Sequence, residues 1–230
     1  MSREEFQDQL DAIQGKTLDM ADLVVERLDE AVAALRDGDA ERARRVVEGD
    51  DVVNRRYLEI EDDCVDLLAL QQPVASDLRF VVATFKIITD LERIADLAVN
   101  VAETADAAAA APTLGESALP EAGEALTGVG DEARELVADA VAAYMSRDVE
   151  ACHSVAAREE ALDAAIEERT RGIVTELVAA CDADGRTGQV VEEVSRLLLV
   201  LRDLERVGDH AVNIAARTLY MVEQDDALLY

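Results

Sequence analysis

Two pairs of carboxylates stand four residues apart in a segment that occurs twice in the chain. One copy, DLERIADLAVNV, contains Glu92 and Asp96, and the other, DLERVGDHAVNI, contains Glu205 and Asp209 at an offset of 113. Residues four apart lie one above the other on a helix, so each copy presents two carboxylates on one face. Such a pair can supply oxygen ligands to a hard or borderline cation. The repeat therefore predicts two equivalent cation sites.

Acidic residues recur in matching places on the neighbouring predicted helices as well. At an offset of 109, an acidic residue followed four positions later by Asn or Asp occurs in both halves, and these residues are Asp50 with Asn54 and Glu159 with Asp163. Weaker candidates extend the acidic strip or lie on the first helix of each half, and they are Asn100, Asn213, Glu30 and Asp139.

The spacing alone does not identify a metal site in this chain. Of 230 residues 51 are Asp or Glu, so random placement would put two acidic residues four apart about 11 times, and such groups usually solvate a face. The recurrence in register beside similar apolar residues is the informative feature. A solvated acidic face paired with arginines stays open as the alternative to metal binding.

Other chemically active residues point away from catalysis. The only histidines are His153 and His210, so a Glu-x-x-His pair in both halves is excluded, and with it the usual di-iron bundle. His210 is a ligand or, as we favour, an ordinary partly buried histidine. The three cysteines, Cys64, Cys152 and Cys181, form no CxxC motif and are expected to pack in the core of a protein in a reducing compartment. We therefore expect a protein that is not an enzyme.

The composition favours packed helices in an acidic protein of the cytoplasm. Half of the residues are apolar but only 3% are aromatic, and the formal net charge is −29. Lysine occurs only at Lys16 and Lys86, and this depletion together with the acidity is typical of a halophile, because molar salt screens the self-repulsion. The charge disfavours nucleic acid as a partner. The absence of a signal pattern or of a long apolar run predicts no membrane insertion.

Apolar residues at helical spacing predict an all-α chain. Breaks at Asp37–Asp39 and Gln71–Pro73 separate three helices, and Asp39 is the expected N-cap of the second. The same plan follows in the second half, so two tandem antiparallel three-helix bundles are expected. The expected helices cover residues 3–36, 40–70, about 77–111, 131–145, 149–181 and 189–222. The expected domains are 1–111 and 121–230, joined by a linker at 112–120.

At this point the motifs resemble those of the PhoU family of phosphate-uptake regulators. The first half contains LLALQQPVASDLR, beginning at Leu67, and KIITDLER, and the second contains LLLVLRDLERVGDHAVN. The resemblance implies paired bundles related by a pseudo-twofold axis. It also implies clusters of iron or zinc, with magnesium or manganese as alternatives, on E(D)xxxD motifs. Those motifs fall on the four pairs named above, and Asn54 departs from the Asp that the pattern has.

The resemblance further implies a non-catalytic regulator of phosphate homeostasis. Its expected partners are the ATPase subunit of a phosphate ABC transporter, which it would restrain, and a sensor kinase. We expect a homodimer. Two other functions remain open, a metal-dependent phosphate-ester hydrolase and a helical scaffold without metal.

Overall fold

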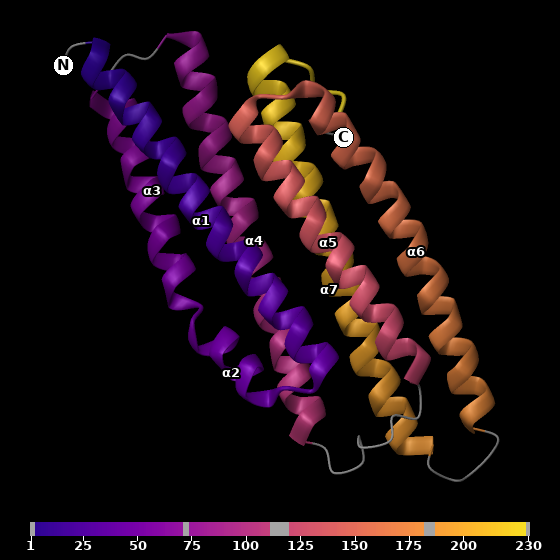
Figure 1. Cartoon of the computed structure of the whole chain (residues 1–230). Helices are drawn as coiled ribbons and strands as arrows, with labels where there is room; N and C mark the ends of the chain where they lie inside the picture. Colours follow the sequence, from indigo (N-terminus) through magenta and orange to yellow (C-terminus); the bar gives the residue numbers. More distant parts are fainter. Residues whose placement is uncertain (1–2, 71–73, 111–119, 182–186, 229–230) are drawn as a thin grey trace.

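Seven helices form the computed structural model, which describes residues 3–70, 74–110, 120–181 and 187–228 (Figure 1). No strand occurs in these ranges, and none of their helices is long and apolar enough to cross a membrane. The expected all-α fold class is confirmed. The helices are α1 (Arg3–Asp37), α2 (Ala40–Glu48), α3 (Asp51–Leu70), α4 (Ala75–Ala110), α5 (Pro120–Ser146), α6 (Val149–Cys181) and α7 (Thr187–Glu223).

The helices form two bundles that lie side by side. Helices α1, α4, α5 and α7 pack against one another in the centre, with α1 against α5 and α4 against α7. The α2–α3 segment covers α1 and α4 on one side, and α6 covers α5 and α7 on the other (Figure 1). Helices α4 and α7 run in opposite directions, as a twofold relation between the halves requires (Figure 1).

The repeated segments lie at the centre of this arrangement. Most of their apolar residues are fully buried, because those residues recur every three or four positions and so face the bundle, whereas Val99 and Val212 are partly buried. Burying such side chains is the main stabilising contribution, at about 25 cal/mol for each Å² of apolar surface. The buried stripe of α4 comprises Leu91, Ile94, Ala98 and Val101, and that of α7 comprises Leu204, Val207, Ala211 and Ile214.

The second expected helix, over 40–70, was wrong as a single element, because the structure divides it into α2 and α3 at Gly49 and Asp50. The Arg27 side chain enters at this point and donates from Nη1 to the Val46 carbonyl at 3.1 Å and from Nη2 to the Gly49 carbonyl. A Cβ at Gly49 would meet this guanidinium within 3 Å. Tertiary packing of Arg27 therefore accompanies the interruption, and glycine leaves the room for it.

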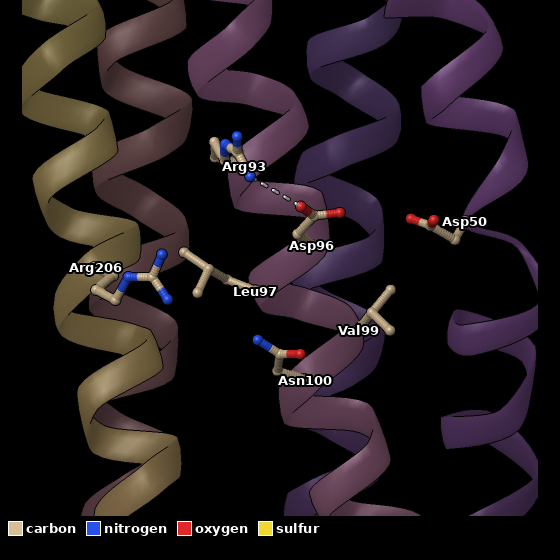
Figure 2. Close-up of a pocket in the computed structure, with 7 residues that line it drawn as sticks. All are labelled: Asp50, Arg93, Asp96, Leu97, Val99, Asn100 and Arg206. Atoms are coloured by element: carbon tan, nitrogen blue, oxygen red, sulfur yellow. Dashed lines mark ion pairs between the residues drawn. The ribbon is translucent and has the colours of Figure 1, made fainter.

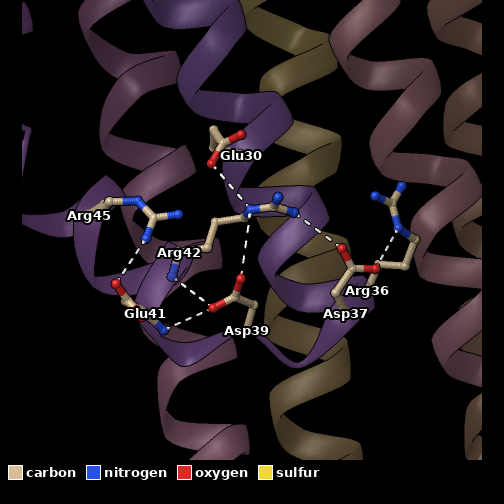
Figure 3. Close-up of polar contacts among 7 residues, drawn as sticks. All are labelled: Glu30, Arg36, Asp37, Asp39, Glu41, Arg42 and Arg45. Atoms are coloured by element: carbon tan, nitrogen blue, oxygen red, sulfur yellow. Dashed lines mark hydrogen bonds and ion pairs between the residues drawn. The ribbon is translucent and has the colours of Figure 1, made fainter.

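The turn before α2 has a counterpart before α6. Gly38 has φ 64°, a conformation that glycine adopts without steric cost, and Arg147 takes φ 56° at the position 109 residues later. The next residue is an N-cap in both, since Asp39 accepts from the Glu41 and Arg42 amides at 3.1 and 3.0 Å and Asp148 from the Ala151 amide at 3.1 Å. The expected cap at Asp39 is confirmed (Figure 3).

The fourth expected helix begins earlier than its glycines suggested. We predicted a start at Asp131, but α5 begins at Pro120, and proline suits the first helical position because its missing N–H needs no partner there. Gly130 lies within α5, where a Cβ would come within 2.8 Å of Val32 on α1. Glycine here permits close packing of the halves. The helix end predicted at Gln71–Pro73 and nearly all of the linker at 112–120 lie outside the described residues.

Candidate metal centre

The repeated carboxylates lie at the edge of the core on α4 and α7. Glu92 and Asp96 follow the buried Leu91 and Ala95, so their side chains are 25% and 44% exposed. Partial burial removes some of the water around a carboxylate, while the side chain can still reach groups on neighbouring helices. The spacing and the packing together thus place both carboxylates beside α3 or, for the pair on α7, beside α6.

The N-terminal acidic cluster, which we define as Asp50, Asn54, Glu92 and Asp96, joins the α2–α3 junction to α4. Asn54 Nδ2 donates to Asp50 Oδ2 at 2.9 Å, while Asp50 Oδ1 is buried without a hydrogen-bond partner. Burial raises the pKa of Glu92, and the negative charges of Asp96 and Asp50 raise it further. The pKa of Asp96 is raised by burial first and by Asp50 second. These effects show that Asp50 is close enough to both to repel their charged forms.

Arginine neutralises this cluster only loosely. Arg93 lies 3.7 Å from a carboxylate oxygen of Glu92 and 3.7 Å from one of Asp96. These are ion pairs at the long end of the range, in which half-exposed side chains gain little. The expectation of an arginine-paired acidic face therefore describes part of this cluster.

The C-terminal acidic cluster comprises Glu159 and Asp163 on α6 and Glu205 and Asp209 on α7. The pKa of Glu159 is raised to about 7, chiefly by burial and then by the charges of Asp163 and Asp209. Burial raises the pKa of Asp163 and of Glu205 as well, and again neighbouring carboxylates add to the effect. Asp163 Oδ1 is buried without a partner, as Asp50 Oδ1 is in the other cluster. At the offset of 109 Asp163 corresponds to Asn54 rather than to Asp50, so the two clusters each leave one buried aspartate oxygen unsatisfied, but at different positions.

A close approach of α6 to α7 forms the second cluster. A Cβ at Gly208 would lie 3.2 Å from Leu162 Cδ2 and 3.5 Å from Glu159 Cγ. An alanine at this position would require the Leu162 side chain to shift by a few tenths of an ångström. Gly208 therefore permits the close approach of the two helices that carry the carboxylates, and sequence reasoning missed it although it stands within the repeated motif.

The clusters fit a cation by the chemistry of their donors. All the polar donors are carboxylate or amide oxygens, which suit hard and borderline cations, and each cluster leaves one buried oxygen that a cation would satisfy. Within the described ranges, however, no group of three or more His, Cys, Asp or Glu side chains is arranged to hold a metal ion. The candidate ligands of each cluster therefore lie close together, but in the described residues they do not converge on one point that a metal ion could occupy.

Two of the weaker candidates are bound by arginines instead. Glu30 lies 3.3 Å from Arg42, which also contacts Asp37 and Asp39 at the α1–α2 turn (Figure 3). Asp139 pairs with Arg158. The structure thus places both acids in local ion pairs.

The remaining candidates, Asn213 and Asn100, lie where the halves meet. Asn213 Nδ2 donates to Asp90 Oδ1 at 3.3 Å, and His210 Nδ1 lies 2.9 Å from the same oxygen. His210 is thus partly buried and held by the other half, as the favoured interpretation required. Asp90 was missed, although as the first residue of the repeated motif it could have been singled out. Asn100 lines a pocket beside Asp96 (Figure 2).

Comparisons with known proteins agree with this architecture. A family model of the PhoU domain matches the chain twice, at residues 17–105 and 126–218. The chain is 33% identical over 97% of its length to the phosphate-specific transport system accessory protein PhoU homolog of Pseudomonas putida, covering 82% of that protein, and 30% identical over 96% to the accessory protein PhoU of Escherichia coli, covering 87%. Among solved structures, PhoU from Pseudomonas aeruginosa superimposes with a TM-score of 0.86 at 32% identity, covering 96% of this chain and 100% of that one. The PhoU protein of Streptococcus pneumoniae gives 0.82 at 26%, covering 96% and 98%.

Proposed function

Because the chain belongs to the PhoU family, we propose that it is a non-catalytic regulator of phosphate uptake and intracellular phosphate homeostasis. The observation that carries the proposal is the double match to the PhoU domain, which covers both three-helix halves. The relatives from Pseudomonas putida and Escherichia coli are named as accessory proteins of a phosphate-specific transport system.

The proposed partner is the ATPase subunit of a phosphate ABC transporter, which the protein would restrain by docking. The long helices offer a broad surface, and the net charge of −29 favours a partner with basic residues at the contact. Such a subunit hydrolyses cytoplasmic ATP, so the protein would act in the cytoplasm. A sensor kinase as a second partner and the homodimer stay predictions.

We further propose that the two acidic clusters bind metal ions. Support comes from the raised carboxylate pKa values, caused first by burial and then by mutual repulsion, and from the two unsatisfied oxygens. A bound cation would neutralise that repulsion and join α3 to α4 and α6 to α7. Iron and zinc are the ions that we expect, with magnesium and manganese as alternatives that all-oxygen ligands also suit.

Elemental analysis of purified variants tests the metal sites. Glu92→Gln with Asp96→Asn should remove the metal of one cluster, and Glu205→Gln with Asp209→Asn that of the other, each lowering the metal content by about half. The matched control is Glu30→Gln, which removes a carboxylate bound to Arg42 and should leave the content unchanged. A wild-type protein without metal, or equal losses in the control, would refute the metal sites.

Capture of the ATPase subunit tests the regulatory function. Tagged protein and the ATPase subunit from the same organism would be mixed in the salt of the native cytoplasm, with and without excess phosphate. We expect the complex under phosphate excess, together with a lowered transport rate in reconstituted vesicles. Absence of any complex under both conditions would contradict the proposed regulation.

A further inference from the structure

A pocket of about 230 Å³ lies at the junction of α4 and α7 and receives one arginine from each half. Its lining includes Arg93 from α4 and Arg206 from α7 (Figure 2). These arginines occupy the same position of the repeated motif, since 206 − 93 gives the offset of 113. The duplication and the antiparallel packing of α4 on α7 thus bring two equivalent guanidinium groups to one pocket.

Both guanidinium groups keep most of their hydrogen-bonding capacity. Among the residues that the structure describes, Arg206 forms one ion pair, to Asp203 at 3.9 Å, and Arg93 forms its two at 3.7 Å. Each guanidinium offers five N–H donors. Arg158, by contrast, is held by three carboxylates, one at 2.7 Å. The pocket arginines are therefore available to a ligand in a way that Arg158 is not.

The pocket suits a small tetrahedral oxyanion. At about 30 Å³ for each water, its volume corresponds to roughly eight waters, enough for a five-atom anion and its remaining hydration. Asn100 also lines the pocket and adds an amide that can donate (Figure 2). Planar guanidinium groups bind phosphate oxygens in a bidentate manner.

We propose that this pocket binds inorganic phosphate, held between Arg93 and Arg206. The choice of phosphate among tetrahedral oxyanions rests on the proposed function, whereas the arginine clamp rests on the geometry. Because one arginine comes from each half, the anion would tie α4 to α7 at the centre of the molecule. Phosphate occupancy would then be coupled to how the two halves sit on each other.

Carboxylates also line the pocket and set a condition on binding. Asp50 and Asp96 belong to the N-terminal acidic cluster, and Asp96 lies 3.7 Å from Arg93 itself. They repel a free anion, and a cation on that cluster would remove the repulsion. Phosphate should therefore bind to metal-free protein through the arginines and more tightly when the carboxylate is neutralised, as in Asp96→Asn.

Equilibrium dialysis with radiolabelled inorganic phosphate tests the site on the full chain, with chelator present. We expect one phosphate for each chain, and a loss of about tenfold in affinity for Arg93→Gln and for Arg206→Gln, since each removes a charge-assisted pair. The matched control Arg171→Gln removes a 71% exposed arginine on α6 and should leave the affinity unchanged. Arg206→Lys separates the guanidinium fork from its charge and should still weaken binding.

The outcomes separate this proposal from the regulatory one. No binding in the wild type, unchanged affinity in both pocket variants or an equal loss in Arg171→Gln would each overturn the phosphate site. Phosphate that binds only with added metal and ignores the arginines would overturn it too. If a protein that binds no phosphate still captures the ATPase subunit, the regulatory function stands and the phosphate site is overturned. If phosphate binds but the ATPase subunit is not captured, the phosphate site stands and the regulatory function is contradicted.

Discussion

Replacing Glu159 by glutamine should stabilise the metal-free protein at neutral and alkaline pH. Glu159 lies in the C-terminal acidic cluster, where burial and the charges of Asp163 and Asp209 raise its pKa to about 7. At neutral and alkaline pH, the folded wild-type protein therefore carries an ionised Glu159 carboxylate in surroundings that favour its protonated form. Glutamine removes that charge and can still donate a hydrogen bond to Asp163, as the protonated acid does.

The sign and size follow from the two pKa values of Glu159. In the unfolded chain the pKa is near 4.5, so the folded state holds the proton more tightly, and stability falls as pH rises from about 4.5 to about 7. At about 1.4 kcal/mol for each pH unit, a fully buried group would lose roughly 3 kcal/mol. Because this side chain is only partly buried, solvent screening reduces the expected effect to about 1 kcal/mol.

Urea unfolding at fixed salt and with chelator measures this effect. Glu159→Gln should exceed the wild type by about 1 kcal/mol at pH 8, and the gain should vanish by pH 4.5. The neighbouring exposed Glu160 provides the control, since Glu160→Gln removes one charge from the same helix, and this charge makes the smallest contribution to the raised pKa of Glu159. A gain that is independent of pH, or an equal gain in the control, would refute the reasoning. So would a loss of stability at pH 8.

Two further predictions concern the fold. Gly49→Ala should destabilise the protein by about 1–3 kcal/mol, because the added Cβ displaces the Arg27 guanidinium that is packed against it. Gly15→Ala, in an open stretch of α1, should stabilise the protein by about 0.5–1 kcal/mol. Urea unfolding compares the two variants, and equal shifts in the free energy of unfolding would contradict the packing account. Tyr144→Phe should cost about 1–2 kcal/mol in the same assay, because the buried hydroxyl lies 2.6 Å from Thr84 Oγ1, and a neutral result would show that this pair contributes nothing.

Local patterns in the sequence were sufficient for most of the helices and most of the acidic residues, but not for the break between α2 and α3 or for the start of α5. Apolar residues at helical spacing predicted the buried stripes of α4 and α7, because an amphipathic helix must turn that face to the core. The turn at Asp39 was predictable because a cap is satisfied by backbone groups two and three residues away. The repeat itself marked Glu92 and Glu205 as equivalent.

Only the tertiary structure decided which of these residues meet. The break between α2 and α3 depends on Arg27, about twenty residues earlier, and the bond between His210 and Asp90 joins positions 120 apart. The carboxylates of the repeated motif become a cluster only because Asp50 at the α2–α3 junction and the acids of α6 lie against them. That repulsion depends on distance and burial between helices, which helical spacing along one helix cannot specify.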